Sequence, residues 1–180
     1  VFGKYLGMMP LEAQKIVDFY GMSRIPHEGP WFLQTHLSDD RVAGDIAKRY
    51  PGPRSLYSSI VAVMTRTDFS EMHRLATDEM WHFYGGMASE ILLLYPNGEG
   101  DLRVFGGSVL EGQEPQLLVP RGTWMGARPI GGEAETYTFF GNTLSPGFEY
   151  EDYQAGDRDE LVGSYPNFEE KIRELTRQDS

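Results

Sequence analysis

The sequence predicts an all-β fold of antiparallel strands. Short segments rich in apolar, β-branched and aromatic residues follow one another through the middle of the chain. Gly- and Pro-containing turns at 51–53, 85–86, 96–98, 120–122 and 131–132 separate many of these segments. No helical spacing of apolar residues lies between them. Short strands with regular turn signals are typical of an antiparallel sandwich or barrel.

Helices are predicted at the two ends of the chain. Pro10 suits a first helical turn and Gly21 suits the left-handed position after a last one, with apolar residues at helical spacing between them. We therefore expect a helix over 10–21. Near the C-terminus, Asn167 is predicted to cap a second helix, with Glu170 completing a capping box.

The strands are expected within a single domain that spans residues 1–180. Their predicted ranges are 31–37, 55–64, 69–75, 79–84, 89–95, 102–106, 116–119, 123–128 and 134–144. Residues 39–54 are polar and contain Gly and Pro, which indicates a long loop. Residues 149–180 are expected to form an acidic, solvated connection, densest in acids over 149–160, followed by the C-terminal helix.

Charge and composition exclude several classes of protein. The chain of 180 residues has 16 Lys and Arg against 27 Asp and Glu, a net charge of −11, which argues against nucleic-acid or anionic-membrane partners. Cysteine is absent, so disulfides and thiolate chemistry are excluded. No apolar run approaches the ~18 residues of a membrane span, and no signal-peptide pattern is present. We therefore expect a cytoplasmic protein.

A stretch at 71–86 places two histidines on either side of Glu79. It reads Glu-Met-His-Arg-Leu-Ala-Thr-Asp-Glu-Met-Trp-His-Phe-Tyr-Gly-Gly. This stretch resembles the first motif of the cupin superfamily, with His73 at the first His position, Glu79 at the Glu and Gly86 at the closing Gly. Pro-Arg-Gly at 120–122 resembles the turn of the second cupin motif.

The chain is most similar to one branch, the small cupin family catalogued as a domain of unknown function. Four segments carry this resemblance: Pro-His-Glu-Gly-Pro-Trp at 26–31, a Ser-rich strand at 55–60, the His-Arg…Asp-Glu-x-Trp-His-Phe-Tyr-x-Gly core at 73–86 and Val-Pro-Arg-Gly-Thr-Trp at 119–124. The resemblance implies a cupin double-stranded β-helix, a jelly-roll barrel over 31–148, with short N- and C-terminal helices. It also implies a small-molecule cavity in the mouth of the barrel and a homodimer.

Histidine can exchange protons near neutral pH, so the cupin-like stretch is the candidate catalytic site. We predict His73 as a base, Glu79 as the group that orients it or acts as its partner, and Tyr84 as an acid. A carboxylate among aromatic residues is costly to bury unless it is paired or faces a solvated cavity, which makes Glu79 informative. The alternative for His73 is an ordinary hydrogen-bonded histidine at a strand end.

The resemblance also raises the question of a metal. A cupin metal site uses three imidazoles and one carboxylate, and here Leu75 and Met125 stand at two of the histidine positions. His82 would replace a ligand only if it faced the same way as Glu79, and strand alternation puts the two on opposite faces. We therefore expect no cofactor, and a divalent metal at His73 and Glu79 is disfavoured.

Further ligand-binding residues are predicted from their places on the strands and turns. They are Glu28, Thr35, Tyr57, His82, Gln116 and Trp124. Trp124 follows the turn of the second motif, where an indole would give a flat wall for a planar ligand or a sugar ring. Ordinary core packing is the alternative for His82 and Trp124.

Three functional hypotheses follow from these residues. The first is a cupin that binds a small polar or sugar-like molecule and epimerises or isomerises it by proton transfer beside a carbonyl group. The second is a non-catalytic binding module. The third is a metal-dependent oxygenase or isomerase, which would use His73, Glu79 and waters as ligands, with His82 as a further candidate ligand.

Overall fold

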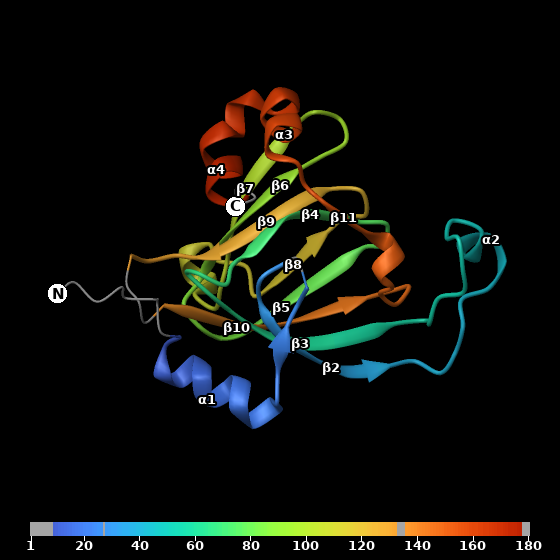
Figure 1. The fold of residues 1–180 in the computed structure, drawn as a ribbon, viewed down its shortest axis with the longest axis horizontal. Coiled ribbons are helices and arrows are strands. Elements are labelled where there is room, and N and C mark those ends of the chain that lie inside the picture. Colours follow the sequence, from blue (N-terminus) through green and yellow to red (C-terminus); the bar gives the residue numbers. More distant parts are fainter. Residues whose placement is uncertain (1–8, 27, 133–135, 178–180) are drawn as a thin grey trace.

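Two antiparallel β-sheets form the body of the protein, and the computed structural model describes residues 9–26, 28–132 and 136–177 (Figure 1). The order of the six-stranded sheet is β1 (Ser23–Arg24), β2 (Trp31–Leu37), β3 (Ser58–Thr65), β10 (Tyr137–Leu144), β5 (Glu79–Gly86), β8 (Gln116–Val119). The order of the five-stranded sheet is β11 (Tyr153–Ala155), β4 (Ser70–Leu75), β9 (Trp124–Pro129), β6 (Ser89–Leu94), β7 (Gly100–Phe105).

This arrangement confirms the predicted all-β jelly roll with few, short helices. Every strand predicted from the turn signals is present, with ends that shift by a few residues. The first residues of the predicted strand 134–144 lie outside the described part of the chain. The short strands β1 and β11 were not predicted, because two or three residues are too few to show alternation.

The main hydrophobic core lies between the sheets. Strands of both sheets contribute its fully buried side chains, among them Met64, Trp81, Ile91, Leu93 and Phe105. Trp81 on β5 stacks on Phe140 of the neighbouring strand, with ring centroids 4.5 Å apart. Because successive side chains on a strand alternate between its faces, the same strands leave a second set of residues on the outside of the sandwich.

Helices cover the outer faces of the two sheets. Helix α1 (Leu11–Tyr20) ends at Gly21, whose φ of 62° is the left-handed conformation that glycine adopts readily, as the sequence predicts. Its buried Ala13 and Val17 pack with Val63 on the outside of the six-stranded sheet. Figure 1 shows α1 below that sheet, with α3 and α4 above the other one. No helix in the described residues is long and apolar enough to cross a bilayer.

Helices α3 (Arg158–Ser164) and α4 (Glu169–Glu174) pack on the five-stranded sheet. Leu161 and Ile172 contact the outward-facing Leu92 and Leu94 of β6. Gly126 on β9 permits this close approach, since a Cβ there would lie 3.2 Å from the Cβ of Leu175, the residue that follows α4. The remaining helical segments are single turns: α2 (Gly44–Ala47), η1 (Val109–Glu111), η2 (Tyr150–Asp152), η3 (Pro166–Phe168).

The C-terminal segment differs from its prediction in two ways. Asn167 does not cap a helix, because it lies inside η3, and α4 begins only at Glu169 without a side-chain cap. An additional helix, α3, starts earlier, where Asp157 accepts a hydrogen bond from the backbone of Glu160. The predicted solvated connection is therefore largely structured: it contains η2, β11 and the first turn of α3.

Candidate functional site

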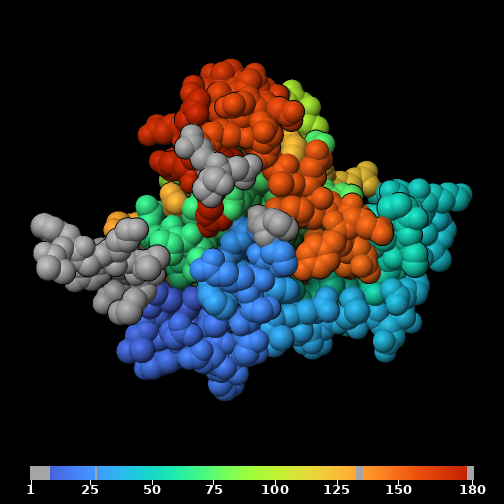
Figure 2. Space-filling model, in the orientation of Figure 1, coloured from blue at the N-terminus to red at the C-terminus, as the bar shows by residue number. Residues whose placement is uncertain are grey.

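A cavity of about 440 Å³ opens between the two sheets. Side chains from β2, β3, β4, β5 and β10 line it, and residues from the segments 21–28 and 148–150 lie around it. Figure 2 shows the N-terminal segment in blue and the segment after β10 in orange on the same face of the molecule. The volume falls within the usual range of small-molecule sites.

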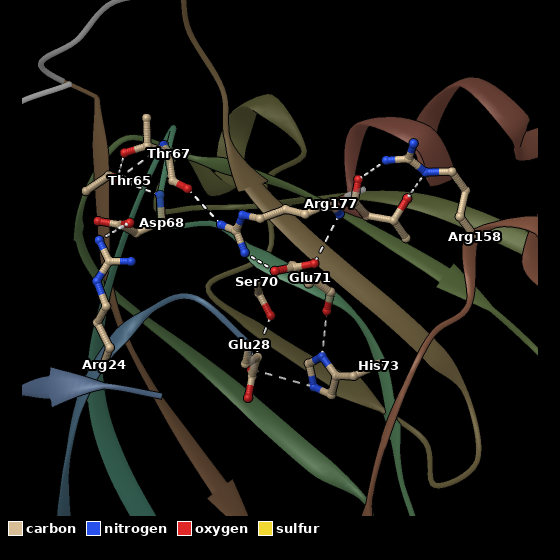
Figure 3. Close-up of polar contacts among 11 residues, drawn as sticks. Arg24, Glu28, Thr65, Thr67, Asp68, Ser70, Glu71, His73, Arg158 and Arg177 are labelled. Carbon is tan, nitrogen blue, oxygen red and sulfur yellow. Dashed lines mark hydrogen bonds and ion pairs between the residues drawn. The ribbon is translucent and has the colours of Figure 1, made fainter. Parts of the chain in front are cut away.

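The imidazole of His73 lies on the five-stranded-sheet side of this cavity. Its Nδ1 donates a hydrogen bond of 2.7 Å to the backbone carbonyl of Glu71, and its Nε2 lies 3.7 Å from Oε1 of Glu28 (Figure 3). The carbonyl fixes the proton on Nδ1, because a carbonyl oxygen can only accept. In the neutral imidazole, Nε2 is then free to accept a proton beside the Glu28 carboxylate.

Neighbouring residues hold this arrangement in place. The buried Ser70 donates a 3.2 Å hydrogen bond to Oε1 of Glu28. The Glu71 carboxylate binds Arg177, which follows α4 and also contacts the carbonyl of Thr67 (Figure 3). The His73 ring stacks on Tyr153 of β11 at 5.4 Å. Burial is the main cause that raises the pKa of Tyr153, and the nearby carboxylates of Glu28 and Glu71 raise it further. The hydroxyl of Tyr153 therefore stays protonated near neutral pH.

Glu79 reaches the same cavity from the opposite sheet. Its side chain is 7% exposed, and Nδ2 of Asn142 on the adjacent β10 donates a 2.6 Å hydrogen bond to its Oε1. Burial raises the pKa of Glu79 to about 7; His73 acts against this shift and Glu28 adds to it. Its second oxygen, Oε2, and the indole nitrogen of Trp81 are both buried without a well-formed hydrogen bond among the described residues, although Trp81 acts to lower the pKa of Glu79.

The structure therefore brings together three of the predicted site residues. His73, Glu79 and Glu28 all line one cavity. Strand alternation explains the position of Glu79: it and Trp81 point into the sandwich, whereas His82 points outwards, as the sequence analysis expects. The imidazole of His73 thus shares one sheltered cavity with the carboxyl group of Glu79, and the pKa of that carboxyl group is near neutrality.

Four other predicted residues lie on the outer face of the six-stranded sheet. Tyr84, His82 and Thr35 line a separate shallow groove there. Gln116 joins them through a 3.4 Å hydrogen bond from its amide to Nδ1 of His82. The prediction that Tyr84 supplies an acid required it to share a cavity with His73. The structure does not place it there, because Tyr84 has the same strand parity as His82.

The last two predicted residues also lie away from the cavity lining. Trp124 packs against the cluster beneath α3 and α4, and the guanidinium of Arg74 lies 4.5 Å from its ring centroid. Its neighbour Met125 takes the inward position on β9, which leaves the indole on the outer face. Tyr57 precedes β3 and is 41% exposed, while the adjacent Ser58 lines the cavity.

The residues of this cavity do not provide the ligand set of a cupin metal site. Within the described residues, no three His, Asp or Glu side chains are grouped so that they could hold a metal ion. Leu75 lines the cavity and Met125 is buried in the core, so both expected histidine positions carry side chains unsuited to a hard or borderline divalent ion.

Sequence reasoning missed other residues that shape the cavity. Asn142 binds Glu79, and Phe140 and Leu144 lie on the same face of β10. The signal was present in the alternation of this strand, where a polar Asn occupies an inward position between Phe140 and Leu144. Glu149 at the cavity was assigned to the solvated connection instead.

Facing antiparallel sheets around a cavity with an inward imidazole and carboxyl group define a protein of the cupin class. The family model described as "Cupin superfamily (DUF985)" matches residues 14–156, and the chain belongs to this family. The resemblance inferred from the motifs is thereby confirmed. No curated protein matches the chain.

Solved structures show the same fold. A protein from Shewanella oneidensis is 27% identical, with a TM-score of 0.79 over 96% of this chain and 100% of that chain. A hypothetical protein from Leishmania major is 22% identical, with a TM-score of 0.81 over 92% of this chain and 99% of that chain. An oxalate decarboxylase from Lactobacillus farciminis, solved as a formate complex, is 10% identical, with a TM-score of 0.51 over 88% of this chain and 43% of its own; this likeness concerns the fold alone.

Proposed function

We propose that the cavity binds a small polar molecule, such as a sugar-like carbonyl compound, and that His73 and Glu79 move a proton on it. The observation that carries this proposal is the pairing of Nε2 of His73 with a buried carboxyl group whose pKa is near neutrality, both at one cavity. Groups with such a pKa can both accept and return protons at physiological pH. The reaction class is epimerisation or isomerisation beside a carbonyl group.

The roles follow from the hydrogen bonds. Nε2 of His73 takes the proton from the carbon next to the carbonyl, and the Glu28 carboxylate beside it stabilises the resulting imidazolium. Glu79, in its protonated form, donates to the carbonyl oxygen as negative charge develops there, and Asn142 holds its other oxygen. Return of the proton from His73 to a carbon of the enol, with return of the enol hydroxyl proton to Glu79, restores the carbonyl group and completes the reaction. Glu79 thus takes the acid role that the sequence analysis gave to Tyr84.

Exchange of solvent deuterium tests the proposal without knowledge of the product. Dihydroxyacetone, D-fructose and D-tagatose are incubated with the protein in D₂O, and loss of the proton next to the carbonyl is followed by ¹H NMR. Because a general base contributes about 10²–10⁴-fold, His73→Gln should slow protein-dependent exchange by about a hundredfold or more. Glu111→Gln, at an exposed residue of η1, is the matched control and should exchange like the wild type. Unchanged exchange in His73→Gln would refute the assignment.

A non-catalytic binding module is the second candidate. It is favoured by the position of Tyr84 on the outer face, which leaves the cavity without the third predicted proton-transfer group. Native mass spectrometry of gently purified protein distinguishes the two candidates. An organic molecule that co-purifies and is released chemically unchanged, together with no deuterium exchange, would favour the binding module.

We also propose that the protein forms a homodimer, as the family resemblance implies. Tyr84 and Leu118 are 52% and 47% exposed on the six-stranded sheet, and a second copy would cover such apolar side chains. Sedimentation equilibrium should then give twice the 20.4 kDa of one chain. A cytoplasmic location stays a prediction of the sequence.

A further inference from the structure

We propose that the ligand of this cavity carries a positively charged nitrogen, as a protonated amine on a compact apolar body. This inference rests on the binding part of the proposed function: it names the chemical class of the bound molecule, in place of a sugar-like compound, and it does not use the acid role given to Glu79. It is drawn from the charge of the lining, from the buried acceptors on its wall and from the apolar surface around them.

The charged groups of the cavity are mainly carboxylates. Glu28, Glu79 and Glu149 all line it. No Lys or Arg side chain belongs to the lining among the described residues. A phosphate or carboxylate ligand would therefore meet like charges without a fixed cation to compensate for them. A cation instead offsets the cost of burying carboxylates in this space.

Two buried acceptors on one wall lack donors. Oε2 of Glu79 and Oδ1 of Asn142 have no well-formed hydrogen bond among the described residues, although the side chains are only 7% and 2% exposed. The indole nitrogen of Trp81, which acts to lower the pKa of Glu79, is also buried without a partner among those residues. Its single N–H can serve one of the two oxygens at most, which leaves at least one acceptor for a ligand. The Asn142 amide already donates to the other Glu79 oxygen, so when Glu79 is ionised the remaining hydrogen-bonding capacity of the pair is for acceptance. A primary ammonium group has three donors and no acceptor, which matches this wall.

Among the described residues of the lining, His73 is the side chain that can become positively charged, and the Glu28 carboxylate already balances that charge. His73 donates through Nδ1 to the Glu71 carbonyl, and its Nε2 faces Glu28. Protonation of His73 therefore forms an ion pair with Glu28, and it does not supply the missing donors to Glu79 and Asn142, for which no bond to His73 is found.

Apolar side chains complete the site. Phe32, Ile60 and Phe140 line the cavity next to the acceptors. Phe148 and Tyr150 form an edge-to-face pair with centroids 5.1 Å apart, and Tyr150 is 60% exposed. Aromatic rings stabilise a nearby cation and also pack against a hydrocarbon body. An amine with a small apolar group therefore satisfies both parts of the lining.

Three ligands that share one apolar body test the charge preference. Benzylamine, benzyl alcohol and benzoate are titrated into the full-length protein by isothermal calorimetry at pH 7. A bond to a charged group is stronger than a neutral one, so benzylamine should bind at least about tenfold more tightly than benzyl alcohol. Benzoate should bind most weakly. Gln34→Trp, at an exposed position of the lining, should block all binding and thereby locate it in the cavity.

Variants of the acceptor wall provide the second readout. Glu79→Gln should lower benzylamine affinity about tenfold and leave benzyl alcohol affinity nearly unchanged, because only the charge of the wall is removed. Glu111→Gln is the control and should bind all three like the wild type. Equal or tighter binding of benzyl alcohol or benzoate, lost in Gln34→Trp, would overturn the amine preference and leave the proposed binding function intact. Benzylamine affinity that is unchanged in Glu79→Gln would also overturn it. No binding of any of the three would overturn the inference and count against the binding function.

Discussion

Glu79 is a buried residue whose pKa the fold moves into the neutral range. At the start of β5 it points between the sheets, where burial raises its pKa from an ordinary value of 4.5 to about 7. Between these two pH values the folded protein binds more protons than the unfolded chain. The free energy of unfolding therefore falls as the pH rises through this window.

Removal of this group should make stability less dependent on pH. Relative to Glu79→Gln, the wild type should lose about 3 kcal/mol of unfolding free energy between pH 4.5 and pH 7, because each pKa unit corresponds to about 1.4 kcal/mol. Urea unfolding of both proteins at pH 4.5, 6 and 8 measures the difference. The unfolding free energy of the variant should increase relative to that of the wild type as the pH rises. If the unfolding free energies of the two proteins change in parallel with pH, Glu79 is not desolvated.

At the level of single residues, the sequence identified the polar centre of the site but not all of its surroundings. His73 and Glu79 were predicted from the first cupin motif and Glu28 from its place in the segment before β2, and all three line the cavity. Tyr84 and Trp124 lie away from the cavity lining, since a motif match does not tell which strand face a side chain occupies. Once Glu79 is known to point inwards, strand alternation places Tyr84 on the outer face of β5.

At the scale of elements, an ion pair ties the long loop to the acidic segment after β10. Arg54 donates to both oxygens of Asp152 at 2.9 and 2.8 Å, and both side chains are almost fully buried. The guanidinium also lies 5.1 Å from the ring centroid of Tyr50. This contact anchors η2, and with it Tyr150 beside the cavity.

Breaking this pair should destabilise the protein strongly. Arg54→Ala leaves Asp152 buried without a counter-charge, which costs about 3–5 kcal/mol of unfolding free energy. The double variant Arg54→Met/Asp152→Leu should recover most of that loss, and Arg49→Ala at an exposed position of the same loop should lose less than about 0.5 kcal/mol. Denaturant unfolding compares the four proteins, and a loss below about 1 kcal/mol for Arg54→Ala would contradict the account.

The strands were predictable because apolar segments and Gly–Pro turns are local signals. The order of strands in the sheets was implied only by the family resemblance. Five of the six acids of the region 149–160 are exposed, as expected for a solvated segment, and Asp152 is the exception because Arg54 from far along the chain pairs with it. Such a long-range contact has no local sequence signal.

At the scale of the whole molecule, one part of the sandwich is packed and another is hollow. Leu93 lies in the packed core with 1% exposure, whereas Leu75 is 9% exposed and lines the cavity. Truncation of a core residue adds the cost of a new void to the lost transfer free energy, but truncation beside an existing open cavity adds little void cost.

The two leucines should therefore respond differently to the same substitution. Leu93→Ala should cost about 4 kcal/mol of unfolding free energy and Leu75→Ala about 2 kcal/mol. Urea unfolding at one pH measures both values. Equal losses would indicate that the space beside Leu75 is filled by packed side chains.

The central claim is that the jelly roll holds a desolvated carboxyl group, Glu79, on the wall of a ligand cavity. The most direct measurement is a ¹³C NMR titration of the Glu79 side-chain carboxyl, assigned with Glu79→Gln, without ligand and with benzylamine. The account predicts a midpoint of about pH 7 for the free protein, which falls when the ammonium group binds and stabilises the ionised form. A midpoint near 4.5 that benzylamine does not move would contradict it.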